Sequence, residues 1–278
     1  MIWMVFVFDI DGTLLEKGSE LDSKTRDFLL RLSQDHTLVF ASGRMYRSVK
    51  KLLERELGKI FPIIAYNGAL IVDESGKILY EATLDSEIAE NVIVFLRSKG
   101  FHRQAYVCDI LFVEEDNEKA KDYSLHSNVE YVVVDDLAKL CRQKPPLKLL
   151  VIDENRDKLR TLAQELKKSF PVDAYGSFPT YLEIVPPDVS KGKALEILAR
   201  IKGFSLEETV AFGDSDNDLG LLETAAIGIA VGNATEILKS RADYVTKGLF
   251  SEGVVEGVEA VLSGVVVPGK RFGASSIR

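Results

Sequence analysis

The chain has 278 residues, of which 46% are hydrophobic and 28% charged, a composition typical of a globular protein with a sizeable core. Its 35 basic and 43 acidic residues give a formal net charge of −8, which argues against a general electrostatic surface for nucleic acid. Any anionic ligand must therefore be held by local groups: a bound metal ion, backbone amides, or a few lysines and arginines.

The cysteines, the histidines and the first residues of the chain favour a reducing, cytoplasmic environment. Cys108 and Cys141 are far apart and the three histidines are scattered, so neither a disulfide framework nor a zinc site is expected. The apolar start of the chain has no basic region before it and is too short to span a bilayer. We therefore expect a cytoplasmic protein without membrane or nucleic-acid partners, and the sequence leaves its oligomeric state open.

The first 83 residues alternate short apolar runs with amphipathic stretches, which predicts βαβ units on a parallel sheet. The expected strands are Val5–Phe8, Leu38–Ala41 and Ile63–Tyr66, and the expected helices are Thr25–Leu32 and Tyr46–Leu57.

Residues 84–186 have a different order of expected helices and strands, and this segment is long enough for an independent α+β domain. Helices are expected over Ser86–Arg97 and Arg156–Lys168, and strands over Tyr106–Val113, Tyr131–Val134, Leu147–Ile152 and Tyr181–Val185.

The alternating pattern returns after residue 186, with helices expected over Lys191–Ile201, Asp218–Ala225 and Val254–Leu262 and strands over Thr209–Phe212 and Ile227–Val231. The predicted fold is therefore α/β: residues 1–83 and 187–278 form a Rossmann-like parallel-sheet core, interrupted by an α+β domain inserted over residues 84–186.

Asp9 and Asp11 follow the first apolar run. If the strand continues through Asp11, both side chains lie on one side, where two like charges raise each other's pKa unless a cation is near. A positive group is therefore expected beside them. The alternative is that Asp11-Gly12 is only a turn and Asp9 a solvated strand end.

Ser42-Gly43-Arg44 follows the second predicted strand and leads into a helix. A small hydroxyl residue and a glycine at such a turn let backbone amides approach an anion, with the helix N-terminus adding partial positive charge. The alternative is that Ser42 is an ordinary N-cap beside a turn glycine.

Lys191 is expected in the first turn of a helix capped by Ser190, where the helix dipole disfavours a positive charge. Its position is better explained if the ammonium faces an anion, although a solvated surface lysine is also compatible with the pattern.

Three aspartates, Asp214, Asp216 and Asp218, follow the predicted strand Thr209–Phe212. Such a cluster at the carboxyl end of a strand suits an oxygen-seeking cation such as Mg²⁺. An EF-hand is excluded because Leu219 stands where that loop needs glycine and Ala225 where it needs glutamate. A solvated acidic N-cap is the alternative, and Asp216 is expected to point outward.

The order of these clusters resembles the four motifs of the haloacid dehalogenase-like hydrolase superfamily over essentially the whole chain. The motifs read DIDGT from Asp9, ASGR from Ala41, SKGKAL from Ser190 and GDSDND from Gly213. The insertion, with YNGA from Tyr66, LEIV from Leu182 and GNA from Gly232, resembles the Cof-type branch of sugar-phosphate phosphatases. Two departures are Leu221, where that family often has methionine, and an atypical C-terminal tail.

The resemblance implies a Mg²⁺-dependent phosphatase acting on phosphate monoesters of small metabolites, with sugar phosphates favoured. Asp9 would be the nucleophile that forms an aspartyl-phosphate, and Asp11 would protonate the leaving alcohol and then activate water. Mg²⁺ would be held by Asp9, the main-chain carbonyl of Asp11 and Asp214, with Asp218 as a direct or indirect partner.

The resemblance also implies substrate contacts. Ser42 with Gly43 and Lys191 would bind phosphoryl oxygens, Asn217 would orient them, and Thr13 would steady the first loop, whereas Arg44 and Asn67 would lie on the substrate side. The insertion would be a cap that sets specificity. Tyr181 and Glu183 share one face of the strand returning from it, although the first could equally be a packing residue and the second a solvated one.

Two other functions remain compatible with the sequence. A phosphomutase or phosphotransferase would share DxDGT and the aspartyl-phosphate, and differ only in the acceptor of the phosphoryl group. A non-catalytic phospholigand-binding protein on the same scaffold would not need Asp9 and Asp11 together. An ion-pumping ATPase is excluded, because its DKTGT pattern would place threonine at position 11.

Overall fold

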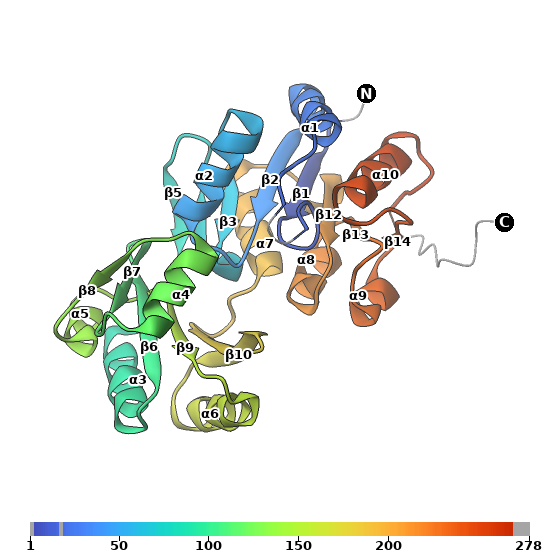
Figure 1. Cartoon of the computed structure of the whole chain (residues 1–278). Helices are drawn as coiled ribbons and strands as arrows, with labels where there is room; N and C mark the ends of the chain where they lie inside the picture. Colours follow the sequence, from blue (N-terminus) through green and yellow to red (C-terminus); the bar gives the residue numbers. More distant parts are fainter. Residues whose placement is uncertain (1–2, 17–18, 269–278) are drawn as a thin grey trace. The chain divides into compact units, whose positions relative to one another are not determined.

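The computed structural model describes residues 3–16 and 19–268 and divides into two compact units (Figure 1). One unit combines the chain up to Tyr80 with the chain from Ser190 onward, and the other is Glu81–Val189. Within the described residues, no helix has both the length and the apolar character that crossing a membrane requires. The C-terminal tail that the sequence marks as atypical lies, after Pro268, outside the described residues.

The first unit contains an eight-stranded sheet in the order β14-β13-β12-β1-β2-β3-β4-β5. Its strands are β1 (Val5–Asp9), β2 (Thr37–Ala41), β3 (Ile63–Ala65), β4 (Leu70–Val72), β5 (Ile78–Glu81), β12 (Thr209–Gly213), β13 (Ile227–Ala230) and β14 (Tyr244–Val245). Its α-helices are α1 (Ser23–Asp35), α2 (Tyr46–Leu57), α7 (Lys191–Lys202), α8 (Leu219–Thr224), α9 (Glu236–Arg241) and α10 (Phe250–Leu262).

Strand β1 lies at the point where the strand order reverses. It pairs in parallel with β2 on one side and with β12 on the other, so the chain winds from β1 through β2 to β3 in one direction and from β12 to β14 in the other. In open parallel sheets, ligands bind outside the carboxyl ends of the strands at such a switch point. The topology therefore indicates that the loops after β1, β2 and β12 form the ligand site.

The alternation of side chains along β1 decides where Asp9 lies. Val5 and Val7 belong to the apolar cluster that includes Leu195 of α7 and Leu221 of α8, whereas Phe6 and Phe8 point to the opposite face. Phe8 packs there against the rings of Phe40 and Phe212, with centroids 5.9 and 5.1 Å apart. Because successive strand residues alternate, Asp9 shares the α7 face with Val5 and Val7.

Helix α7 has clear sequence signals at both ends. The side chain of Ser190 accepts a hydrogen bond from the backbone N–H of Lys193, as an N-cap does. Gly203 ends the helix in the left-handed conformation, which glycine adopts without steric cost. These two signals set the ends of α7 and so place Lys191 in its first turn.

The second unit contains a six-stranded sheet in the order β10-β11-β9-β6-β7-β8, with an apolar core between this sheet and the helices on one of its faces. Its elements are α3 (Ser86–Ser98), β6 (His102–Val107), β7 (Ile110–Val113), α4 (Glu118–Ser127), β8 (Tyr131–Val133), α5 (Leu137–Gln143), β9 (Lys148–Ile152), α6 (Arg156–Ser169), β10 (Asp173–Phe178) and β11 (Tyr181–Val185).

The α/β class, the Rossmann-like parallel core and the inserted α+β domain are confirmed, but several predicted elements need correction. The expected strand Tyr106–Val113 is wrong: β6 and β7 form a hairpin, because the chain turns at Cys108 and Asp109, both with positive φ. The helix expected from Asp218 begins at Leu219, after a short 3₁₀ turn. Strand β3 ends at Ala65, one residue earlier than expected.

Candidate active site

The carboxyl edge of the parallel sheet brings together side chains that are far apart in the sequence. Asp9 is the last residue of β1, Ser42 follows β2, and Asp214 follows β12. Lys191 reaches the same place from the first turn of α7. The clusters that the sequence places at strand ends therefore do meet, as the switch-point geometry requires.

Lys191 is the centre of a buried charge cluster. Its side chain is only 1% exposed, and its Nζ donates to Asp9 Oδ1 at 2.6 Å and to Asp218 Oδ1 at 2.7 Å. The lysine thus faces anions, as its unfavourable place in the helix suggests, and the alternative of a solvated surface lysine is wrong. In this structure the anions that it binds are two carboxylates.

The cluster holds more negative than positive charge. Burial and the neighbouring Asp218 raise the pKa of Asp9 well above its usual value, although Lys191 opposes the shift. Burial and Asp218 likewise raise the pKa of Asp214 to about 6. Burial alone would lower the pKa of Lys191, but the two carboxylates outweigh it and the pKa lies above its usual value. One ammonium is therefore too little positive charge for this group of carboxylates.

A divalent cation fits the donor set. Oxygens of Asp9, Asp214 and Asp218 lie within 4.8 Å of one another. Asp9 Oδ2 is buried and has no hydrogen-bond partner, an expensive arrangement for a carboxylate oxygen unless a cation joins it. Carboxylate oxygens are the donors that Mg²⁺ prefers.

The two oxygens of Asp218 are already engaged by the protein. Oδ1 accepts from Lys191, and Oδ2 accepts from the backbone N–H groups of Asp214 and Ser215 at 3.1 and 3.2 Å. Asp218 therefore holds the lysine and the loop after β12 in place. The sequence leaves open whether Asp218 contacts the metal directly or supports it indirectly, and this bonding pattern favours the indirect role.

The condition under which alternation would place Asp9 and Asp11 on one side, a strand that continues through Asp11, is not met. Strand β1 ends at Asp9, and the half-exposed carboxylate of Asp11 forms a two-pronged ion pair with Arg44, including a 2.7 Å bond from Nε to Oδ2. The positive group expected beside the two aspartates is thus two groups, Lys191 for one carboxylate and Arg44 for the other.

Ser42 is buried, and its Oγ accepts from the backbone N–H of Arg44 at 3.1 Å. The N-cap of α2 is instead Met45, which offers no side-chain bond, so the alternative of Ser42 as an ordinary N-cap is wrong. A Cβ on Gly43 would lie 3.1 Å from the amide atoms of Asn67. The glycine thus lets these two loops approach closely.

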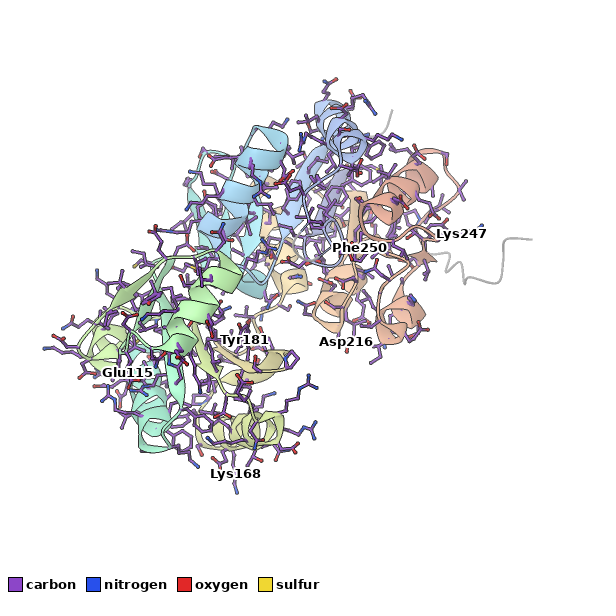
Figure 2. All side chains as sticks on the ribbon, viewed as in Figure 1. Glu115, Lys168, Tyr181, Asp216, Lys247 and Phe250 are labelled. Atoms are coloured by element: carbon purple, nitrogen blue, oxygen red, sulfur yellow. The ribbon has the colours of Figure 1, made fainter. Side chains whose placement is uncertain are left out.

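The loop after β3 is strained and clamped. Tyr66, Asn67 and Gly68 all have positive φ, which is costly for a side chain as bulky as tyrosine. The backbone N–H of Asn67 donates to Ser42 O at 3.0 Å, and the Asn67 side chain accepts from Asn217 Nδ2 at 3.3 Å. The structure therefore gathers these predicted substrate contacts around one edge of the sheet. Asp216, in contrast, is exposed, as expected (Figure 2).

Gly12 is needed where the loop after β1 passes the acidic cluster. Its φ is +90°, and a Cβ there would lie 2.3 Å from Asp214 Oδ2, far inside contact distance. Thr13 Oγ1 donates to Asp214 Oδ1 at 3.2 Å. Thr13 thus ties the loop after β1 to Asp214.

Asn233 has a role that the sequence analysis did not assign. Its Nδ2 donates to Gly12 O at 2.7 Å, and its Oδ1 accepts from the backbone N–H of Phe250 at 2.8 Å, at the start of α10 (Figure 2). The residue follows β13 at the same edge of the sheet as Asp214. Its place after a parallel strand was the signal that could have identified it.

Tyr181 and Glu183 lie on β11 in the second unit and not in the cluster described above. Glu183 pairs with Lys148 at 3.2 Å, so the alternative of a solvated strand residue is wrong. The Tyr181 ring packs edge-on against Tyr123.

Known proteins are similar to this chain in sequence and in fold. The sequence pattern of haloacid dehalogenase-like hydrolases matches residues 6–258. A Bacillus subtilis relative, 5-amino-6-(5-phospho-D-ribitylamino)uracil phosphatase YwtE, is 31% identical, covering 92% of this chain and 97% of the relative.

Two solved structures are also similar to this chain. The crystal structure of TM0651 from Thermotoga maritima has a TM-score of 0.86 at 39% identity, over 95% of this chain and 97% of that chain. A haloacid dehalogenase-like hydrolase from Bacteroides thetaiotaomicron has a TM-score of 0.84 at 29% identity, over 94% and 100%. The chain is therefore an enzyme of the haloacid dehalogenase-like hydrolase family.

Proposed function

We propose that this enzyme is a Mg²⁺-dependent phosphatase that hydrolyses phosphate monoesters of small metabolites, in particular sugar phosphates, through a phosphorylated Asp9. The observation that carries the proposal is the buried Asp9, held by Lys191 through one oxygen and left without a partner at the other. A purely structural ion pair has no use for an unpartnered buried oxygen, whereas a nucleophile beside a cation site does.

Asp9 and Asp11 would divide the work of two successive displacements. In the first, an oxygen of Asp9 forms a bond to phosphorus while the bond from phosphorus to the substrate's alkoxy oxygen breaks, and Asp11 gives that oxygen a proton. In the second, Asp11 takes a proton from water, whose oxygen attacks phosphorus and displaces the Asp9 carboxylate. The products are an alcohol and inorganic phosphate, and both aspartates are regenerated.

The metal would be held by Asp9, Asp214 and the main-chain carbonyl of Asp11, and the bonding of Asp218 favours an indirect contribution from that residue. When bound, Mg²⁺ neutralises charge on the phosphoryl group and on the cluster of carboxylates. Thr13 and Asn233 fix the loop after β1, through Asp214 and Gly12 respectively, and so hold the main chain around Asp11 in place.

The phosphoryl oxygens would be bound by the Lys191 ammonium, the Ser42 hydroxyl and the backbone at Gly43. Asn217 and Asn67, which already contact each other, would lie beside them. Arg44 pairs with the Asp11 carboxylate and favours its ionised form, so it would have to release Asp11 before that residue could give a proton, and it would then lie on the substrate side.

The choice of sugar phosphates is supported by the nature of the relative YwtE, whose named substrate carries its phosphate on a ribityl chain. We propose that the unit Glu81–Val189 acts as the cap domain that selects among such esters. Tyr181 and Glu183 are the candidate specificity residues of this cap.

The test is a screen of sugar and polyol phosphates with Mg²⁺ and with EDTA, measuring inorganic phosphate and the organic product. We expect phosphate release only with Mg²⁺, its loss in Asp9→Asn, and full activity in the matched control Asp216→Asn, which changes an exposed aspartate near the site. An isomerised sugar phosphate instead of free phosphate would identify a phosphomutase. Turnover by Asp9→Asn at the wild-type rate would overturn the proposal.

A further inference from the structure

A pocket lies in the first unit, away from the cluster around Asp9. It has a volume of about 420 Å³, within the range of sites that bind small molecules. Its lining includes Trp3 just before β1, Thr37 at the start of β2, and Phe61 just before β3. These positions mark the amino edge of the parallel sheet, whereas Asp9 and Asp214 lie at the carboxyl edge.

The length of helix α7 gives the distance between the charge cluster around Asp9 and this pocket. Lys191, in its first turn, belongs to the charge cluster, and Lys202, its last residue, lines the pocket. Eleven residues of α-helix rise about 16 Å. The pocket is therefore not an extension of the proposed active site.

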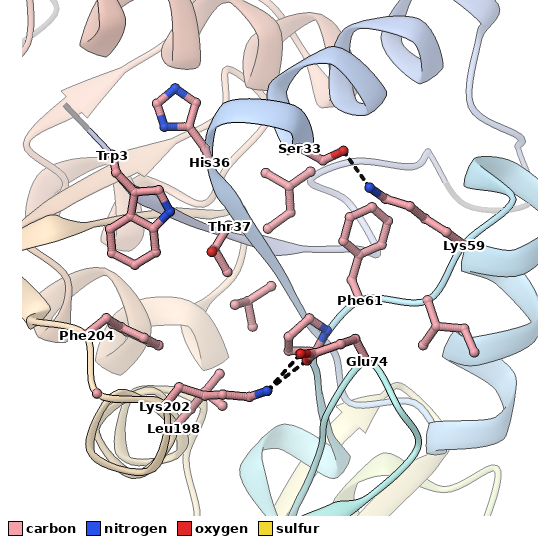
Figure 3. Close-up of a pocket in the computed structure, with 15 residues that line it drawn as sticks. Trp3, Ser33, His36, Thr37, Lys59, Phe61, Glu74, Leu198, Lys202 and Phe204 are labelled. Carbon is pink, nitrogen blue, oxygen red and sulfur yellow. Dashed lines mark hydrogen bonds and ion pairs between the residues drawn. The ribbon is translucent and has the colours of Figure 1, made fainter. Parts of the chain in front are cut away.

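The pocket has aromatic walls on two sides (Figure 3). Trp3 and Phe204 lie on one side and Phe61 on the other, and Leu198 contributes apolar surface. Trp3 is 41% exposed, which is unusual for the largest hydrophobic side chain. An apolar lining with a few polar groups is the usual character of a small-molecule site.

The charged groups of the pocket differ in how well they are neutralised. Lys202 donates to both oxygens of Glu74, at 3.0 and 2.9 Å. Lys59 donates to the uncharged Ser33 Oγ at 2.8 Å and lies 4.8 Å from the Phe61 ring centroid. Across residues 3–16 and 19–268, no carboxylate forms a salt bridge with Lys59, so its positive charge is uncompensated at the pocket.

We propose that this pocket binds a small aromatic molecule that carries one negative charge, with its ring against Trp3 and Phe204 and its anionic group directed to Lys59. Ring stacking accounts for the exposed indole, and the Lys59 ammonium, which forms no salt bridge with a described carboxylate, supplies charge complementarity. Figure 3 shows the aromatic pair and Lys59 on opposite sides, so the ligand is elongated, with a ring at one end and the anionic group at the other.

Trp3 provides the measurement because it is the single tryptophan of the chain. The probe is 1-pyrenebutyrate, which joins an aromatic ring system to a carboxylate and accepts excitation energy from tryptophan. Titration of the full-length protein should give saturable sensitised pyrene emission at one probe per chain. The uncharged 1-pyrenebutanol should bind more weakly, and excess inorganic phosphate should displace neither.

Three variants test whether the sensitised pyrene emission comes from a probe bound in this pocket. Lys59→Gln should weaken 1-pyrenebutyrate about two- to fivefold, the range of an exposed ion pair, and leave 1-pyrenebutanol unchanged. Phe204→Ala should weaken both probes. Lys51→Gln removes an exposed lysine on α2 that does not line the pocket and should change nothing. Hydrolysis of p-nitrophenyl phosphate should be unaffected in all three variants.

The proposal is overturned if energy transfer never saturates, if 1-pyrenebutanol binds the wild type as tightly as 1-pyrenebutyrate, or if Lys59→Gln and Lys51→Gln bind 1-pyrenebutyrate equally. Displacement of the probe by inorganic phosphate would place it at the carboxyl edge of the sheet and would also overturn the proposal. None of these outcomes depends on whether the enzyme hydrolyses sugar phosphates.

Discussion

Replacing Lys191 with methionine removes the only positive side chain that contacts Asp9 and Asp218 among the described residues. Methionine fills a similar volume, so the change removes charge more than packing. Two buried carboxylates then lose their partner, and breaking a buried ion pair from one side typically costs about 3–5 kcal/mol. We therefore expect Lys191→Met to lower the free energy of unfolding by about that amount without metal.

The assay is urea unfolding followed by circular dichroism at pH 8 in EDTA. The raised pKa of Lys191 means that its stabilising effect is complete below its ordinary value of 10.5 and declines only as the pH rises above that, so pH 8 lies within its range. Lys193→Met is the matched control, since Lys193 is exposed in the same turn of α7. It should change the free energy of unfolding by no more than about 0.5 kcal/mol.

A second arm adds Mg²⁺. A cation that binds only the folded state stabilises it, and the variant has a larger uncompensated negative charge than the wild type. Mg²⁺ should therefore stabilise Lys191→Met more than the wild type. The reasoning is refuted if the variant lies within about 1 kcal/mol of the wild type in EDTA, or if Mg²⁺ leaves their difference unchanged.

Three further changes test the supports of the site and of the fold. Asn233→Ala should lower kcat at least about tenfold with a smaller change in KM, because the loop after β1 loses its anchor, and Asn233→Gln should not restore kcat to the wild-type value. Gly12→Ala should abolish turnover but leave a folded protein by circular dichroism, since its methyl group would collide with Asp214. Hydrogen bonds from Thr25, at the start of α1, lower the pKa of Asp22. Asp22→Ala should therefore cost about 1 kcal/mol of stability at pH 7, and that deficit should fade as the pH drops below 3.8. A deficit that stays constant with pH would contradict the capping role.

The sequence predicts the core and the location of the site because both follow from periodicity. Buried parallel strands read as continuous apolar runs, as Val5–Phe8 does, and their carboxyl ends meet at one edge of the sheet. Chemistry-bearing residues just after such runs, such as Asp9, Ser42 and Asp214, must therefore come together. No knowledge of side-chain contacts is needed for that step.

The hairpin in the second unit shows where such patterns fail. Tight two-residue turns need positive φ and usually contain glycine or asparagine. Here Cys108 and Asp109 adopt φ of 50° and 58°, and Cys108 carries no turn signal in the sequence. The apolar run across the turn therefore reads as one strand. Short elements such as β4 and β14 are missed for a simpler reason, since two or three residues carry no period.

A sequence pattern also cannot predict which charged side chains pair with each other. The spacing of Asp9 and Asp11 predicts a nearby positive group, but the end of β1 sends the two carboxylates to different partners, Lys191 and Arg44. The double engagement of Asp218 depends on backbone amides that face it only after the loop has folded. Such contacts are set by three-dimensional geometry and not by residue spacing.

The most direct test of the proposed mechanism is to trap the phosphoryl group on the enzyme. In Asp11→Asn, transfer from p-nitrophenyl phosphate should survive because its phenolate leaves without a proton, whereas hydrolysis of the phosphoenzyme should slow by about 10²–10⁴ because water has lost its base. Rapid mixing with Mg²⁺ should give a burst of one p-nitrophenol per chain. Borohydride reduces an acyl phosphate to an alcohol and releases the phosphate, so mass spectrometry after reduction should find homoserine in place of Asp9 and thereby locate the phosphorylated residue. Steady turnover without a burst, or phosphate on another residue, would contradict the assignment of Asp9 as the nucleophile and Asp11 as the acid and base.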